Sequence, residues 1–249
     1  MDTQKIALVT GGIGGIGTAI CVALADQGRK VIAGYFPPEA EIASAWQAKH
    51  RDNGYEFEIV ACDVSDFESS KQMLHDVENT IGSVDILVNC AGITRDKTLR
   101  RMTHEQWDAV LRTNLDSAFN VTRQVVEGMT EKGFGRIVNI SSVNGQKGQF
   151  GQANYSAAKA GLHGFTMAIA QETALKGVTV NTVSPGYVAT EMTKAIAPDI
   201  LESITQTIPM RRMGEPEEIA QAVAWLADEA TAYVTGANIP VNGGLFMAA

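Results

Sequence analysis

Thr10-Gly11-Gly12-Ile13-Gly14-Gly15-Ile16-Gly17 follows an apolar, strand-like run at residues 6–9 and leads into a helical pattern at residues 15–27. Glycines permit positive φ angles and a close approach of the backbone to a ligand. The first turn of a helix also offers free N–H groups to a pyrophosphate. The alternative is a tight strand–helix turn, which does not need so many flexible residues. No Gly-Lys-Ser or Gly-Lys-Thr follows, so the loop is not a Walker A sequence. The stretch therefore predicts a dinucleotide site.

Short apolar runs of β type alternate with helical patterns along the rest of the chain. The expected strands lie at residues 31–33, 57–61, 86–88, 136–140, 178–183 and 238–241, and the expected helices include residues 67–81, 104–129 and 152–176. This alternation is typical of a parallel sheet covered by helices on both faces. We predict one doubly wound (Rossmann) α/β domain over residues 1–249, with a mostly parallel seven-stranded sheet. A helical insertion at residues 190–210 is expected to form a lid.

The composition excludes several classes of protein. The 249 residues are 45% hydrophobic and 19% charged, which is typical of one globular domain. The net charge of −8 excludes nucleic acid as the main partner, because phosphate binding needs a basic face. Three cysteines without a CxxC motif indicate a reduced, cytoplasmic chain. The histidines are scattered, so we expect no metal site. We see no signal peptide and no apolar run of ~20 residues, so we expect neither secretion nor a membrane span.

Tyr155 and Lys159 form the candidate acid–base pair. A spacing of four on a helix places both side chains on one face, with the ammonium within reach of the phenol. A free phenol titrates near ~10, and we expect the neighbouring positive charge to lower that pKa. Ser142, upstream of the pair, is expected to polarise a substrate oxygen. Side chains alternate at the end of a strand, so only one of two neighbouring serines can face the site, and Ser141 is the alternative.

The residues after the second strand bear on the choice between NAD and NADP. An acid at this place would bind the ribose 2′-hydroxyl and favour NAD. Here the strand ends with Gly34-Tyr35-Phe36-Pro37-Pro38, and the first acid, Glu39, lies beyond both prolines. The missing acid favours NADPH, with NADH not excluded. Asp63, after the third strand, is expected either to meet the adenine end of the cofactor or to cap a turn.

These motifs together resemble the short-chain dehydrogenase/reductase family over nearly the whole chain. Family motifs are matched, in the expected order, by Gly11, Gly15 and Gly17, by Asn89-Cys90-Ala91-Gly92, by Asn114, by Ser142, by Tyr155 with Lys159, and by Pro185-Gly186 with Thr190. Two residues depart from the pattern. Cys90 replaces a second asparagine, which we expect to alter strand packing more than chemistry. Gly14 stands where NADP-using members often carry a basic residue.

The resemblance implies a reductase that uses a nicotinamide cofactor and a serine–tyrosine–lysine site. Its catalytic residues would be Ser142, Tyr155, Lys159 and Asn114. Asn114 would anchor a water beside Lys159, and the alternative is that its amide only bonds the backbone. The cofactor would contact Gly11, Gly15, Ile16, Gly17, Asp63, Asn89, Ala91, Gly92, Tyr155, Lys159, Pro185, Gly186 and Thr190.

Within the family the sequence is similar to two groups of enzymes. One comprises acetoacetyl-CoA reductases, which supply (R)-3-hydroxybutyryl-CoA for polyhydroxyalkanoate synthesis, and residues 140–152 and 159–167 resemble this group most. The other comprises the 3-oxoacyl-acyl-carrier-protein reductases of fatty acid synthesis. Carrier protein is acidic, so the negative charge of this chain favours the CoA ester. The third alternative, a non-catalytic nucleotide-binding scaffold, is disfavoured because Ser142, Tyr155 and Lys159 are all present.

Substrate contacts and assembly are expected from the same resemblance. Gln149, Gln152 and Tyr187 flank the catalytic residues and are expected to bind the 3-oxoacyl thioester. For the glutamines the alternative is a solvated loop. Met192 and Ile196 on the expected lid would either contact the acyl chain or pack the helix. A homotetramer would form through the long helices before and after the fifth strand.

Overall fold

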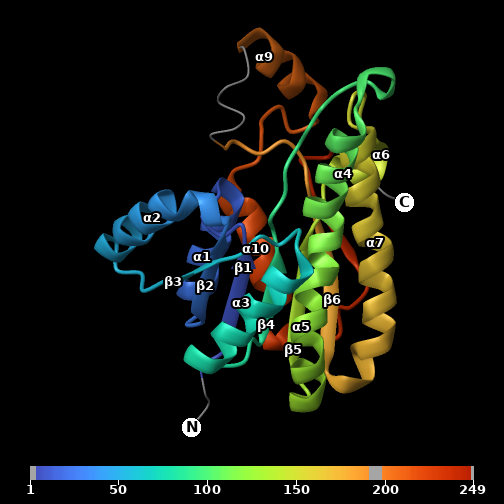
Figure 1. The fold of residues 1–249 in the computed structure, drawn as a ribbon. Helices are drawn as coiled ribbons and strands as arrows, with labels where there is room; N and C mark the ends of the chain where they lie inside the picture. Colours follow the sequence, from blue (N-terminus) through green and yellow to red (C-terminus); the bar gives the residue numbers. More distant parts are fainter. Residues whose placement is uncertain (1–3, 191–197, 248–249) are drawn as a thin grey trace.

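Strand β4 occupies the middle of a seven-stranded sheet in the computed structural model. Figure 1 shows how the labelled strands and helices are arranged. The structure describes residues 4–190 and 198–247. All six pairs of neighbouring strands are parallel, which confirms the predicted doubly wound architecture. In spatial order the strands are β3 (Glu58–Ala61), β2 (Lys30–Tyr35), β1 (Ile6–Thr10), β4 (Ile86–Asn89), β5 (Gly135–Ile140), β6 (Val178–Pro185) and β7 (Asn238–Val241).

Helices cover both faces of this sheet (Figure 1). Helices α1 (Gly15–Asp26) and α10 (Pro216–Ala227) pack together on one face, and α3 (Phe67–Thr80), α5 (Ser117–Lys132) and α7 (Ala153–Thr173) cover the other. Alternate strand residues are buried on opposite faces, with Val9 in the first apolar cluster and Leu8 in the second. Further helices are α2 (Ala40–Asp52), α4 (His104–Leu111), α6 (Val143–Lys147) and α9 (Pro198–Thr207).

The order of the strands places the predicted site residues at one edge of the sheet. The chain leaves β1 toward α1 on one face and leaves β4 toward α4 and α5 on the other. The carboxyl ends of β1 and β4 therefore form the crevice in which doubly wound sheets bind ligands. The glycine loop follows β1, residues 90–92 follow β4, Ser142 follows β5, and Pro185 ends β6. Parallel pairing thus brings these segments together.

One predicted helix differs from the observed structure, and part of the expected lid lies outside the described residues. The helix expected at residues 104–129 is divided into α4 and α5 by a π-helical turn, Arg112–Asp116, and such turns often mark functional sites. In the expected lid, the described helix α9 begins at Pro198, and Met192 and Ile196 lie outside the described residues.

Within residues 4–190 and 198–247 no helix has the length and apolar character needed to cross a bilayer. In the same ranges no three His, Cys, Asp or Glu side chains are grouped so that they could hold a metal ion.

Candidate active site

The glycine loop is too tightly folded to carry side chains at three of its positions, Gly11, Gly12 and Gly17. Gly11 has a φ of +63°, and a Cβ built on it would lie 2.9 Å from Cα of Ala91. A Cβ on Gly17 would lie only 2.1 Å from the carbonyl oxygen of Gly11. Gly11 and Gly17 are therefore required where the loop turns back on itself and meets the end of β4.

The exposed backbone at the start of α1 fits a diphosphate group. Gly14 is the N-cap of this 12-residue helix, and both Gly14 and Gly15 are exposed. A helix N-terminus presents N–H groups and a partial positive charge to an anion. Ile16 can contribute its backbone, because its side chain packs against the core beneath. Thr190 lies opposite, with Cγ2 at 3.0 Å from the position that a Cβ of Gly15 would take. The residues present therefore fit a dinucleotide.

Hydrogen bonds to Thr10 hold the loop after β4 next to the glycine loop. Its Oγ1 accepts hydrogen bonds from the backbone N–H groups of Cys90 (3.0 Å) and Ala91 (3.2 Å). Cys90, the departure from the family pattern, packs its side chain against the apolar core, and burial raises the pKa of its thiol to about 11. This thiol therefore remains protonated at neutral pH. The two hydrogen bonds to Thr10 place Ala91 beside Gly11 of the glycine loop.

Two predicted cofactor residues make their side-chain hydrogen bonds within the protein. The Nδ2 group of Asn89 donates to Oδ1 of Asn139 (2.8 Å) and to Oγ1 of Thr122 (3.2 Å). Its amide thus fixes β4 to β5 and α5. The Oδ1 atom of Asp63 accepts from the N–H (3.0 Å) and the hydroxyl (2.7 Å) of Ser65. These contacts fit the turn-capping alternative for Asp63, and its contact with the adenine end of the cofactor stays a prediction.

Ser142 and Tyr155 meet where β5 ends and α7 begins. Ser142 is the N-cap of α6, and its Oγ accepts from the N–H of Asn144 at 3.1 Å. Tyr155 lies in the first turn of α7, with its hydroxyl close to that of Ser142. Burial raises the pKa of Tyr155 above its ordinary value, the Asp96 carboxylate raises it further, and the nearby Ser142 hydroxyl opposes this rise. The phenol is therefore protonated at neutral pH.

Lys159 lies one turn further along α7, on the same face as Tyr155. Its side chain is 4% exposed, and its Nζ donates to the carbonyl oxygen of Ile140 at 2.8 Å. The ammonium lies 5.7 Å from the centre of the Tyr155 ring. Burial lowers the pKa of Lys159 to about 8. The expected lowering of the Tyr155 pKa by Lys159 is wrong for this arrangement, because burial is the dominant influence on both groups.

The two neighbouring serines have different roles. Ser141 is 3% exposed, and its Oγ donates to the backbone oxygen of Lys159 at 2.7 Å. The same Oγ lies 2.9 Å from Nε2 of His163. The structure thus places Ser142 beside the tyrosine and uses Ser141 to hold α7 against the end of β5.

The side chain of Asn114 bonds the backbone, which is the alternative considered from the sequence. Its Nδ2 donates to the carbonyl oxygens of Ile93 and Val110, both at 2.9 Å, and its Oδ1 accepts from the N–H of Ile93 at 3.2 Å. A Cβ on Gly92 would lie 2.5 Å from this Oδ1 and 3.5 Å from Nζ of Lys159. Asn114 therefore lies near Lys159 and fixes the loop that passes it.

The two predicted substrate glutamines occupy different surroundings. Gln149 is exposed, and its Oε1 accepts from Nζ of Lys147 at 3.0 Å. Gln152 bridges two segments, since its Oε1 accepts from Nδ2 of Asn144 (2.9 Å) and its Nε2 donates to Oδ2 of Asp96 (2.8 Å). Gln152 thus joins the turn after Ser142 to the loop after β4, at the mouth of the site.

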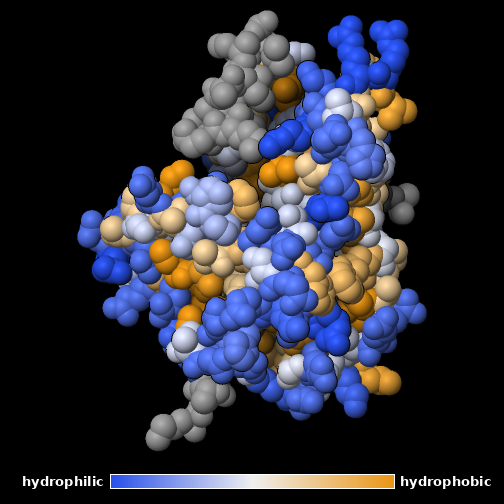
Figure 2. Space-filling model, viewed as in Figure 1, coloured by the Kyte–Doolittle hydropathy of each residue, from blue (hydrophilic) through white to orange (hydrophobic). Residues whose placement is uncertain are grey.

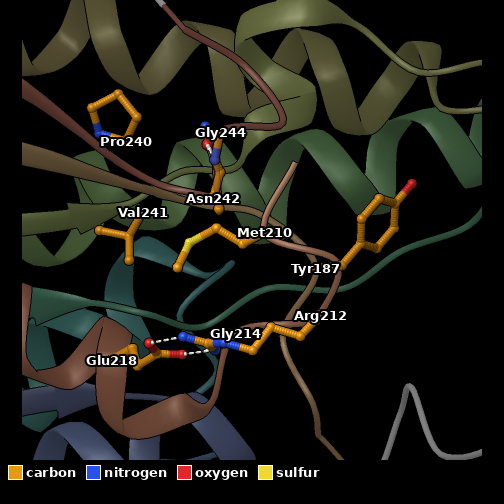
Figure 3. A pocket seen from close by; sticks show the side chains of 10 residues that line it. Tyr187, Met210, Arg212, Gly214, Glu218, Pro240, Val241, Asn242 and Gly244 are labelled. Carbon is orange, nitrogen blue, oxygen red and sulfur yellow. Dashed lines mark hydrogen bonds and ion pairs between the residues drawn. The ribbon is translucent and has the colours of Figure 1, made fainter. Parts of the chain in front are cut away.

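The turn after β6 carries Pro185, Gly186 and Tyr187. A Cβ on Gly186 would lie 2.8 Å from Cα of Asn242, so the turn packs closely on the end of β7. Tyr187 borders a pocket of about 260 Å³, and Figure 3 shows its ring pointing away from the nearby ion pair of Arg212 and Glu218. The other residues around this pocket are Met210, Gly214, Pro240, Val241, Asn242, Gly243 and Gly244.

Sequence analysis missed two residues of this site. Asp96 acts on Tyr155 through its charge and binds Gln152, but it lies in an irregular loop where spacing gives no signal. His163 contacts Ser141, and here a signal exists in the sequence. It stands four residues after Lys159 and eight after Tyr155, so it shares their face of α7.

Comparisons with known proteins agree with this geometry. A family model described as enoyl-(acyl carrier protein) reductase matches residues 11–246. The chain is 60% identical to an acetoacetyl-CoA reductase of Allochromatium vinosum over 98% of this chain and 99% of the relative. It is 58% identical to an acetoacetyl-CoA reductase of Cupriavidus necator, again over 98% and 99%. A 3-oxoacyl-acyl-carrier-protein reductase of Vibrio cholerae is 46% identical over 98% of each chain.

Proposed function

The chain belongs to the short-chain dehydrogenase/reductase family, and we propose that it reduces acetoacetyl-CoA to (R)-3-hydroxybutyryl-CoA with NADPH. The identities to the two acetoacetyl-CoA reductases, which exceed the identity to the carrier-protein reductase, support this substrate. We place the reaction in the cytoplasm, with its product feeding polyhydroxyalkanoate synthesis.

The chain's own residues can bind and protonate a ketone oxygen. When bound, a nicotinamide cofactor would supply the hydride for the carbonyl carbon. The hydroxyls of Ser142 and Tyr155 lie close together, and each can turn its hydrogen to the same ketone oxygen and stabilise the negative charge that develops there. Tyr155 then gives its proton to that oxygen, a role that suits a phenol whose pKa is raised. Lys159, with a pKa of about 8, can return a proton toward Tyr155 at neutral pH.

The closeness of the Ser142 and Tyr155 hydroxyls, with Lys159 buried beside them, is the observation that supports catalysis most directly. A nucleotide-binding scaffold would not need a buried ammonium at this position, because burying a charge is unfavourable. The test is NADPH oxidation with acetoacetyl-CoA, followed by absorbance. Turnover that requires acetoacetyl-CoA supports the proposal. Cofactor binding without turnover of any short 3-oxoacyl thioester contradicts it.

The choice of NADPH rests on the residues at the end of β2. Tyr35 ends this strand and Phe36 follows, so no carboxylate stands where it would repel a 2′-phosphate. Residues 31–48 also contain no lysine, arginine or histidine, so this segment supplies no cation to attract the phosphate. We therefore propose NADPH as the preferred cofactor and NADH as an accepted one. Titration of the intact protein with each reduced cofactor, followed by fluorescence, measures both dissociation constants.

The 3-oxoacyl-acyl-carrier-protein reductase activity is the second candidate. It is favoured by the description of the matching family and by the similarity to the Vibrio cholerae enzyme. The negative net charge of the chain disfavours it, because an acidic carrier protein would be repelled. Steady-state rates with acetoacetyl-CoA and with carrier-bound acetoacetyl groups separate the two. A carrier-bound rate far above the CoA rate would reverse the assignment.

We further propose a homotetramer formed through α5 and α7. Phe119 on α5 is 50% exposed and stacks on Phe67 with ring centres 6.0 Å apart, and Met167 on α7 is 51% exposed. Figure 2 shows hydrophobic side chains among polar ones over this face of the molecule. Burial of such side chains between subunits would be favourable. A light-scattering mass of a single chain would contradict the proposal.

A further inference from the structure

A line of polar side chains runs along the face of α7 that meets the sheet. It begins with the catalytic pair, continues through His163 and ends at Thr166. Lys159 bonds the end of β5 through Ile140, and Thr166 bonds Asn139 of β5 (2.8 Å) and Thr182 of β6 (2.8 Å). A polar contact of this kind fixes the position of a helix more sharply than an apolar one, because hydrogen bonds depend on both distance and direction.

His163 is the member of this line with contacts to two strand ends. Its Nε2 lies 2.9 Å from Oγ of Ser141, directly after β5, and 3.4 Å from Oγ of Ser184 on β6. Ser141 precedes the catalytic Ser142, and Ser184 precedes the Pro185-Gly186 turn at the cofactor crevice. One imidazole therefore joins three segments of the active site: α7, the turn after β5 and the end of β6.

The hydrogen atoms of the two serines determine which nitrogen of His163 carries the proton. The hydroxyl of Ser141 gives its one hydrogen to the backbone oxygen of Lys159, which can only accept. The hydroxyl of Ser184 gives its hydrogen to Oδ1 of Asn238 at 2.6 Å. Neither serine has a hydrogen left for His163, so both can only accept from it. Nε2 is therefore the donor, and burial favours the neutral imidazole by lowering the pKa of His163.

We propose that His163 is a positioning residue for the proposed reduction: its Nε2–H group holds Ser142, Tyr155–Lys159 and the Pro185-Gly186 turn in one arrangement. The inference rests on the proposed function because turnover of acetoacetyl-CoA is used to test it. The contacts of His163 themselves do not depend on that function. Without the donor, the oxygens of Ser141 and Ser184 lose the group that joins them, and the hydroxyl of Ser141 is free to leave the Lys159 carbonyl. The expected result is a small displacement of Ser142 relative to Tyr155.

Such a displacement should reduce turnover more than binding. Misplacement of reacting groups by about 1 Å lowers rates by as much as roughly 100-fold, whereas the residues that hold the diphosphate lie on other elements. We expect His163→Leu to lower kcat with acetoacetyl-CoA by roughly 10- to 100-fold. The KM and the dissociation constant for NADPH should stay within about threefold of the unmodified protein. His163→Gln, which can place an amide N–H near the position of Nε2, should restore most of kcat.

A control variant separates positioning from a general loss of stability. His50 is also buried, at 9% exposed, but packs among Trp46, Tyr55 and Phe57 at the β3 edge of the sheet. We expect His50→Leu to leave kcat within about twofold even if its melting temperature falls as far as that of His163→Leu. A kcat for His163→Leu within threefold of the unmodified value would overturn the proposal. So would equal losses in the Leu and Gln variants.

A second variant and an NMR measurement test the proposal even if His163→Leu does not fold. If His163→Leu does not fold, Ser141→Ala removes the acceptor instead, and normal kcat in that variant would overturn the inference. Nitrogen NMR of the ¹⁵N-histidine-labelled protein reads the tautomer without any substrate. A neutral Nε2–H imidazole at residue 163 is expected, and the Nδ1–H tautomer would contradict the geometry. Absence of acetoacetyl-CoA turnover in the unmodified protein, with this tautomer present, would refute the proposed function alone.

Discussion

The ammonium of Lys159 lies 5.7 Å from the centre of the Tyr155 ring, and burial shifts the pKa values of the two groups in opposite directions. Burial disfavours the charged form of each, the phenolate of Tyr155 and the ammonium of Lys159. Tyr155 therefore keeps its proton to higher pH, and Lys159 loses its proton near pH 8. The pair is suited to donating a proton, which is what reduction of a ketone requires.

The buried ammonium should make Lys159→Met more stable than the unmodified protein at pH 7. The folded-state pKa of about 8 lies below the ordinary unfolded value near ~10.4, so the unfolded chain binds more protons between these pH values. The free energy of unfolding should then rise with pH between these two pKa values. Below pH 8 the charged Lys159 lowers the free energy of unfolding by its full amount. This amount at pH 7 is on the order of 2 to 3 kcal/mol.

Chemical denaturation at pH 7 and pH 9.5 measures this effect. The gain from Lys159→Met should be largest at pH 7 and smaller at pH 9.5, while turnover is lost at both. Lys176→Met, at an exposed position, serves as the control and should show no such change with pH. A Lys159→Met protein that is less stable at pH 7 would show that the hydrogen bond to Ile140 outweighs the burial of the charge.

Tyr155→Phe should lose turnover and keep its cofactor. The substitution removes only the hydroxyl that lies next to Ser142, and loss of a general acid lowers rates by roughly 10²- to 10⁴-fold. We expect a kcat with acetoacetyl-CoA reduced by at least about 100-fold and an NADPH dissociation constant changed by less than about threefold. Tyr233→Phe alters a fully exposed tyrosine and should behave like the unmodified protein. Retained turnover in Tyr155→Phe would remove this residue from the mechanism.

The sequence was sufficient to predict those features that depend on pattern. Apolar strands alternating with helices specify a parallel sheet, and the carboxyl ends of its strands meet at one edge whatever the details of packing. The placement of Ser142 next to Tyr155 follows from that topology, because Ser142 comes shortly after β5 and Tyr155 lies in the first turn of α7. The spacing of four between Tyr155 and Lys159 likewise needs only a helix.

Direction and burial of side chains could not be predicted in the same way. The pKa of Tyr155 depends on how deeply the phenol is buried and on Asp96, which comes from a loop distant in sequence. The amide of Asn89 donates a hydrogen bond to Asn139, which is 50 residues away in the sequence. Asn114 sits in a π-helical turn that helical periodicity does not show. Each of these outcomes depends on three-dimensional contacts that no local motif encodes.

Gly17→Ala should weaken cofactor binding because the loop has no space for a methyl group. The added Cβ would lie 2.1 Å from the carbonyl oxygen of Gly11, so the backbone that would face the diphosphate must move. We expect the dissociation constant for NADPH to rise by at least about tenfold, a loss comparable to one or more charge-assisted hydrogen bonds. Isothermal calorimetry with NADPH measures it.

A second glycine provides the control for this prediction. Gly128 lies inside α5 with no atom within 4 Å of the position of its Cβ. Gly128→Ala should leave NADPH binding unchanged and stabilise the helix by up to about 1 kcal/mol. Unchanged NADPH binding in Gly17→Ala would show that the loop can open without loss of the diphosphate contacts.

Phe36→Arg should strengthen the preference for NADPH over NADH. Phe36 follows β2 directly and is 49% exposed, and residues 31–48 supply no other cation to a ribose 2′-phosphate. An arginine at this position can form charge-assisted hydrogen bonds with a phosphate, worth roughly tenfold or more in affinity. The NADPH dissociation constant should fall by that factor while the NADH value changes by less than about twofold. Leu175→Arg, which adds the same charge at a residue 98% exposed beyond the end of α7, controls for general electrostatic attraction. An equal gain in both variants, or a gain for NADH as well, would show that the end of β2 does not contact the ribose.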